Sequence, residues 1–230
     1  MATLEVPLFP LGIVLLPGTP QLLHIFEPRY RQMLADCLEA DAPFGLSFVK
    51  TGGAQAQDDP APEPGAVGCL AMVRESRLLP DGRSNILTVG GDRYVLRSYV
   101  DADLPYRMAL VETFDDEDLN TPQLDELAAQ ARAQFARFVT GMQTLSDRPL
   151  ESVPLESSAQ AVSFQIAAAL DLEGEVKQEL LMLRSTQERL RRLLRVFRPL
   201  NEELARRVVV HRRARGNGKG GHRRDVLTGE

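Results

Sequence analysis

Hydrophobic positions in the first forty residues change from short, interrupted runs to a helical period. Apolar runs cover residues 6–9, 13–16 and 21–26, and prolines and glycines lie within and between them. Because proline has no N–H to donate to a sheet, these runs predict short or edge strands. Apolar residues then recur at i, i+3, i+4, i+7 and i+8, which predicts one helix face packed on the sheet. The residues of that face are Tyr30, Met33, Leu34, Cys37 and Leu38.

The pattern after this helix is that of a β-rich domain. Extended runs are predicted over residues 44–50, 66–74, 86–89, 93–100 and 106–114, while residues 51–65, rich in Gly, Pro and acid, predict a mobile loop. Asp81 and Gly82 lie between two such runs and predict a hairpin turn. Gly90 and Gly91 predict a tight backbone excursion between two strands. Several short strands with one early helix indicate a twisted, partly closed antiparallel sheet.

The second half of the chain has a helical period. Residues 115–118 are all acidic and predict a solvated joint, after which Thr121 is expected to cap a first helix. Ser157 and Gln160 have the spacing of a capping box for a second helix. A third helix is predicted from Val176 to Phe197, and Pro199 is expected to end or kink it. Three such helices joined by short loops predict a small bundle.

Length and charge divide the chain further. We predict a β-rich domain over residues 1–116, a helical bundle over 117–210 and a basic, disordered tail over 211–230. The formal net charge of the 230 residues is −5, but residues 205–224 hold eight of the 27 Lys and Arg residues and no Asp or Glu. The other 19 basic residues face 32 acidic ones, so the rest of the chain is acidic, at −13.

The totals also predict a compartment. The chain has two cysteines, its N-terminus lacks the pattern of a secretory signal, and no segment has the ~20 apolar residues that span a bilayer. We therefore predict a cytoplasmic protein without membrane contact.

Two segments of the N-terminal region carry a resemblance. Residues 7–18, PLFPLGIVLLPG, and residues 23–34, LHIFEPRYRQML, resemble the opening of the N-terminal substrate-binding domain of ATP-dependent Lon proteases. They are closer still to the small bacterial proteins that carry this domain alone. Weaker similarity continues to about Phe114. The resemblance implies a PUA-like pseudo-barrel, so the predicted fold class is α+β, with this pseudo-barrel and its one early helix followed by the helical bundle.

The residues that catalysis would need are not grouped in the sequence. Gly218 and Lys219 are followed by glycine and not by Ser or Thr, so they do not form a phosphate-binding loop. His24 is predicted to lie in a strand, far in sequence from the other two histidines. Cys37 and Cys69 are isolated, which favours buried apolar side chains over a zinc site. We predict no catalytic residue, no cofactor and no metal ion.

Charged residues around the first helix are the candidates for binding. We predict that Glu27, Arg29 and Arg31 face a partner. The alternative is a solvated polar face with local ion pairs worth ~0.3–0.5 kcal/mol each. Arg93 and Arg97, by contrast, are expected to bind acidic residues within the fold.

These observations favour a non-catalytic protein- or peptide-binding module over an enzyme. The resemblance implies recognition of unfolded or extended polypeptide, with weak affinity, and a place in protein quality control. A sheet edge or an apolar groove would serve such binding. The alternative is a nucleic-acid-associated factor that uses a PUA-like fold and the basic tail. The acidic remainder of the chain argues against it.

Overall fold

The computed structural model describes residues 2–50, 61–117, 122–146 and 155–217, with only the backbone given for 212–217. The strands are β1 (Thr3–Leu11), β2 (Pro20–Ile25), β3 (Phe44–Phe48), β4 (Val67–Leu78), β5 (Ser84–Val100) and β6 (Met108–Phe114). The helices are α1 (Pro28–Glu39), α2 (Pro122–Leu145), α3 (Ala159–Ala169), α4 (Gly174–Met182) and α5 (Thr186–Asn217). The predicted α+β class, with a β-rich part followed by helices, is confirmed.

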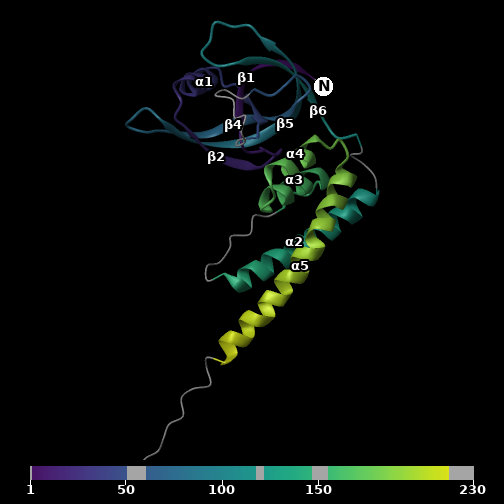
Figure 1. Cartoon of the computed structure of the whole chain (residues 1–230). Helices are drawn as coiled ribbons and strands as arrows, with labels where there is room; N and C mark the ends of the chain where they lie inside the picture. The colour runs from purple at the N-terminus through teal and green to yellow at the C-terminus, as the bar shows by residue number, and fades with distance from the viewer. Residues whose placement is uncertain (1, 51–60, 118–121, 147–154, 218–230) are drawn as a thin grey trace, which may run out of the picture.

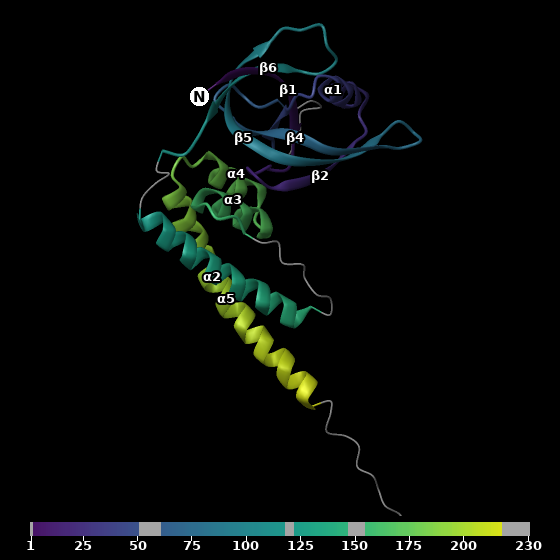
Figure 2. The ribbon, with the colours of Figure 1, turned by 180° about the vertical axis from the view of Figure 1, so that it is seen from behind.

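The strands form one mixed sheet in the order β2-β5-β4-β3-β1-β6, and β5 also pairs with β6. All neighbours are antiparallel except β1 and β3, which run parallel because the chain crosses back through β2 and α1 between them. The sheet is curved but is not a closed barrel (Figure 1). Helix α1 lies at one end of the sheet, while α3 and α4 lie between the sheet and the long pair α2 and α5 (Figure 2).

The predicted interruption at Gly90 and Gly91 is wrong, because β5 continues through both glycines. Along one edge of β5, its first part pairs with β2 and its last part pairs with β6. Strand β4 pairs along the other edge of β5. Gly90 serves a close approach instead. It donates its N–H to Thr19 O at 3.0 Å, and a Cβ at this position would lie 2.1 Å from Leu16 O.

A second glycine contact lies within the curve of the sheet. The fully buried Tyr94 ring packs against Gly45 and Gly68, and its hydroxyl lies 2.7 Å from Ser47 Oγ. A Cβ at Gly68 would lie 2.3 Å from the phenol. Neighbouring apolar side chains complete this small core; they are Val6, Leu8, Leu70, Leu96, Ala109 and Val111.

The larger core joins the sheet to the helices. Tyr30, Met33, Leu34 and Cys37 of α1 are buried in it, as predicted. Leu38 is not, since 48% of it is exposed. The predicted helix face is therefore right over its first two turns and wrong at its last position, where Leu38 lines an open hollow beside the β4–β5 hairpin and not the core.

The helical part differs from the prediction at three points. The predicted third helix is two helices, α4 and α5, separated by residues 183–185, and α5 continues through Pro199 to Asn217. It therefore enters the segment predicted as tail; residues 218–230 lie outside the described part of the chain, as does the predicted cap Thr121. The cap of α3 is Ser158 and not Ser157, because the Ser158 hydroxyl accepts a hydrogen bond from Ala161 N at 3.1 Å.

The predicted solvated joint is wrong at Asp116, which is 6% exposed. Its carboxylate bonds Arg93 from β5 and Arg189 from α5, and the Thr186 hydroxyl donates to it as well. Arg93 also donates to Leu181 O at 3.0 Å and to Leu183 O at 2.5 Å. This cluster holds the sheet and the helices in one arrangement.

Candidate functional site

Helix α1 separates two hollows in the surface. Glu27 precedes the helix in an extended conformation, and Pro28 occupies the first turn, where its missing N–H costs no hydrogen bond. Residues two apart on a helix differ in direction by roughly 200°. Arg29 and Arg31 accordingly line different hollows, so the three predicted binding residues do not form one rim.

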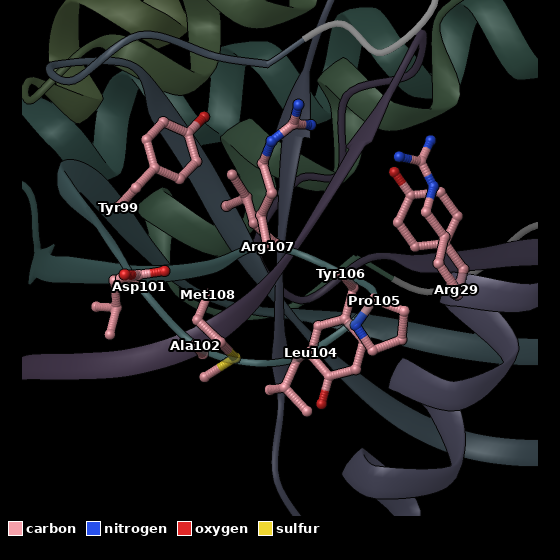
Figure 3. A pocket seen from close by; sticks show the side chains of 12 residues that line it. Arg29, Tyr99, Asp101, Ala102, Leu104, Pro105, Tyr106, Arg107 and Met108 are labelled. Carbon is pink, nitrogen blue, oxygen red and sulfur yellow. The ribbon is translucent and has the colours of Figure 1, made fainter.

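The first hollow, here called the tyrosine pocket, lies between the start of α1 and the connection from β5 to β6, and measures about 450 Å³. Figure 3 shows Tyr99 on one side of it, Arg29 on the other and Arg107 between them. Its lining also includes Leu8, Tyr30, Val100, Asp101, Ala102, Leu104, Pro105, Tyr106 and Met108.

Polar groups in the tyrosine pocket have partners within the protein. The Arg29 guanidinium pairs with Glu27 at 3.0 Å and lies 4.5 Å from the centre of the Tyr30 ring. Tyr106 donates its hydroxyl proton to Asp36 at 2.7 Å, and Tyr99 donates to a backbone carbonyl. Burial, together with this bond to Asp36, raises the pKa of Tyr106. These contacts stabilise the fold and leave few groups to orient a ligand.

The second hollow lies between α1 and the hairpin of β4 and β5, and measures about 520 Å³. We call it the α1–hairpin groove. Leu38 is 48% exposed on the helix side and Leu78 is 72% exposed on the hairpin side. The other lining residues are Pro28, Arg31, Gln32, Leu34, Ala35, Ser76, Gly82 and Ser84. No acidic side chain belongs to this lining.

The hairpin turn shapes one end of the groove. Gly82 has φ of +80°, and a Cβ there would lie 2.2 Å from the Arg31 guanidinium. Glycine therefore serves both the left-handed turn and the close approach of Arg31. Asp81 in the same turn is paired with Arg83 at 2.5 Å, and this contact lowers the pKa of the Asp81 carboxyl.

Other predicted residues have structural roles. Arg93 and Arg97 bind Asp116 and Glu112, as expected of them. His24 contacts Asn85 at 2.7 Å on an exposed strand face. Both cysteines are buried and unpaired, and burial, with a smaller effect of Asp36, raises the pKa of Cys37 to about 11.

The described ranges show neither a metal-binding cluster nor a membrane-spanning helix. No group of three or more His, Cys, Asp or Glu side chains there could hold a metal ion. No helix in the same ranges is long and apolar enough to cross a membrane.

Sequence reasoning missed the most exposed part of the groove. Leu78 is the last residue of β4, whose final five residues are all exposed, and it lies two residues before the hairpin turn. An apolar residue beside a polar hairpin turn was the available signal. The exposure of Leu38 had no such signal, because its spacing matches that of the buried residues on α1.

Comparisons with known proteins agree with this architecture. A family model of the ATP-dependent protease La (LON) substrate-binding domain matches residues 5–197. Lon protease 1 of Thermus thermophilus is 32% identical over 196 residues, which are 83% of this chain and 24% of the protease. A Lon protease of Syntrophomonas wolfei is 26% identical over 90% of this chain and 25% of its own length. The chain thus spans about a quarter of the length of these relatives.

Solved structures show the same fold. A Lon N-terminal domain protein from Xanthomonas campestris superposes with a TM-score of 0.59 and 24% identity, over 83% of this chain and 97% of that one. The N-terminal domain of a Mycobacterium avium complex Lon protease superposes with a TM-score of 0.62 and 15% identity. This superposition covers 84% of this chain and 97% of that domain. With the match over residues 5–197, the chain belongs to the family of the Lon protease substrate-binding domain.

Proposed function

We propose that this protein is a non-catalytic module that binds unfolded or extended polypeptide in the α1–hairpin groove. The observation that carries the proposal is the pair Leu38 and Leu78, two exposed leucines on opposite walls of one groove. Apolar side chains exposed together on a soluble domain are typical of interaction sites. An extended chain could place an apolar side chain between them. The family's description as a substrate-binding domain supports the same assignment.

The proposed affinity is weak. A groove of this size contacts only a few residues of a polypeptide, and small interfaces bind in the micromolar range or more weakly. Such binding suits a protein that must release its client. We place this activity in protein quality control and in the cytoplasm, with the buried, unpaired cysteines as support for a reducing compartment. The nucleic-acid alternative depends on the PUA-like fold and on the basic segment at residues 205–224, and the α1–hairpin groove gives it no support.

The experiment is a titration of casein, a naturally unfolded protein, against the native protein and two variants. Leu78→Ser should weaken binding at least threefold. Leu22→Ser is the matched control, because Leu22 is 73% exposed on β2 but does not line the groove. Equal binding by Leu78→Ser and the native protein, or a loss confined to Leu22→Ser, would contradict the proposal.

A further inference from the structure

The charges around the α1–hairpin groove are unevenly satisfied. The acidic side chains nearest to Arg31 in the sequence and at the hairpin turn are all engaged elsewhere. Glu27 pairs with Arg29, and Asp81 pairs with Arg83. Asp36 accepts hydrogen bonds from Gln32 at 2.7 Å and from Tyr106 at 2.7 Å.

The Arg31 side chain is exposed, and no hydrogen bond or ion pair joins its guanidinium to another residue that the structure describes, while its backbone N–H donates to Glu27 O at 2.9 Å. The position of its guanidinium is nevertheless fixed, because this group packs against the Gly82 backbone at the end of the groove. A guanidinium held in one position beside an apolar surface is well suited to bind a carboxylate, because it can donate two parallel hydrogen bonds to it. The lining offers no acidic group of its own to compete.

From this arrangement we infer that Arg31 is the carboxylate-binding group of the groove. The inference rests on the proposed function and specifies its substrate: an extended polypeptide segment with an apolar side chain near a carboxylate. The segment at residues 205–224 is a poor occupant, because it carries eight Lys and Arg residues and no acidic one.

The helix fixes the spacing of the two groups. Arg31 and Leu38 are seven residues apart on α1, which is about 10 Å at 1.5 Å per residue. An extended chain advances ~3.3 Å per residue. The carboxylate and the apolar side chain of the ligand should therefore be about three residues apart.

The test uses short peptides whose apolar residue is tryptophan, since this protein has none and the peptide signal is read alone. The first peptide is blocked at both ends and has a glutamate three positions from the tryptophan, made in both orders. The second replaces that glutamate by glutamine. The third keeps the glutamine but ends in a free carboxylate three positions after the tryptophan. Binding is followed by tryptophan fluorescence at low and high salt.

We expect the glutamate peptide, in at least one order, to bind about threefold to tenfold more tightly than the glutamine peptide. Arg31→Gln should remove this preference and leave the affinity for the glutamine peptide unchanged. Arg77→Gln is the control and should retain the preference for glutamate. Arg77 lies between the groove residues Ser76 and Leu78 on β4, and successive side chains of a strand point to opposite faces. Salt should reduce the preference. If only the third peptide binds more tightly than the glutamine peptide, and Arg31→Gln removes this difference, then Arg31 binds the C-terminal carboxylate of a polypeptide and not a glutamate side chain.

The results separate the two proposals. One outcome is that the peptides bind, that Leu78→Ser weakens their binding, and that the glutamate and glutamine peptides bind equally well. The role inferred for Arg31 is then refuted, and the proposed function stands. If neither the peptides nor casein bind, the proposed function itself fails. A concentration-dependent dimer that Leu78→Ser abolishes, without peptide binding, would assign the groove to a second copy of the chain and overturn both.

Discussion

The Asp116 carboxylate and the Arg189 guanidinium form an ion pair whose side chains are both fully buried. Arg93 pairs with the same carboxylate, and the Arg189 guanidinium lies 3.8 Å from the centre of the Phe164 ring. One acidic side chain thus connects β5, the segment after β6 and α5. The α1–hairpin groove lies in the β-rich part, whose position against the helices depends on this contact.

Asp116→Asn should therefore destabilise the whole chain. Removing one member of a buried ion pair leaves its partners uncompensated and costs about 3–5 kcal/mol. Urea unfolding followed by circular dichroism measures the loss. Glu117→Gln is the control, because Glu117 is exposed and 3.6 Å from Arg184, and its loss should stay within ~0.5 kcal/mol. Similar losses for the two variants would show that the Asp116 pairs are not important for stability.

The same carboxyl should make stability depend on pH. Burial alone would raise the pKa of Asp116, but the bonds and charge of Arg189, with Thr186 and Arg93, outweigh it and lower the pKa. A carboxyl with a lowered folded-state pKa stabilises fully above its unfolded value of about 3.9. This contribution disappears as the pH falls through the folded-state pKa. The free-energy difference between the native protein and Asp116→Asn should be constant from pH 7 to about 5 and shrink below about 4. A constant difference down to pH 2 would contradict this.

Gly68→Ala should destabilise the curved part of the sheet. The new Cβ would meet the Tyr94 phenol at 2.3 Å and Leu46 O at 2.6 Å, so a backbone segment must move. Overpacking of this kind costs about 1–3 kcal/mol. At Gly91, on the adjacent strand β5, the nearest atom to a new Cβ is 3.5 Å away, and Gly91→Ala should have little effect. Thermal unfolding of both variants provides the comparison, and equal melting temperatures would refute the tight contact.

Leucines 34 and 38 of α1 should respond differently to truncation. Leu34 is 4% exposed, so Leu34→Ala should cost about 2–5 kcal/mol. Leu38→Ala, at 48% exposure, should change stability by no more than ~0.5 kcal/mol. Leu38→Ala should instead weaken casein binding. A large stability loss in Leu38→Ala would mean that its side chain belongs to the core.

Local patterns in the sequence determined several parts of this fold. The 3.6-residue period placed α1 on Tyr30, Met33 and Leu34, because one helix face must be apolar to cover the sheet. Asp81 and Gly82 located the hairpin, because its turn needs a residue with positive φ. These features depend on residues close together in the chain, so a short window of sequence contains their cause.

The tertiary structure alone decided which of these residues bind one another and which are exposed. Asp116 stands in an acidic run, yet it is buried because Arg93 and Arg189, 23 and 73 residues away in the chain, meet there. Leu38 keeps the helical period, yet 48% of it is exposed, because it lines the open α1–hairpin groove and not the core. Arg31 gained its place in a groove only when the turn at Gly82 was folded against α1. Burial and charge pairing depend on contacts between distant segments, and for that reason no local period could predict them.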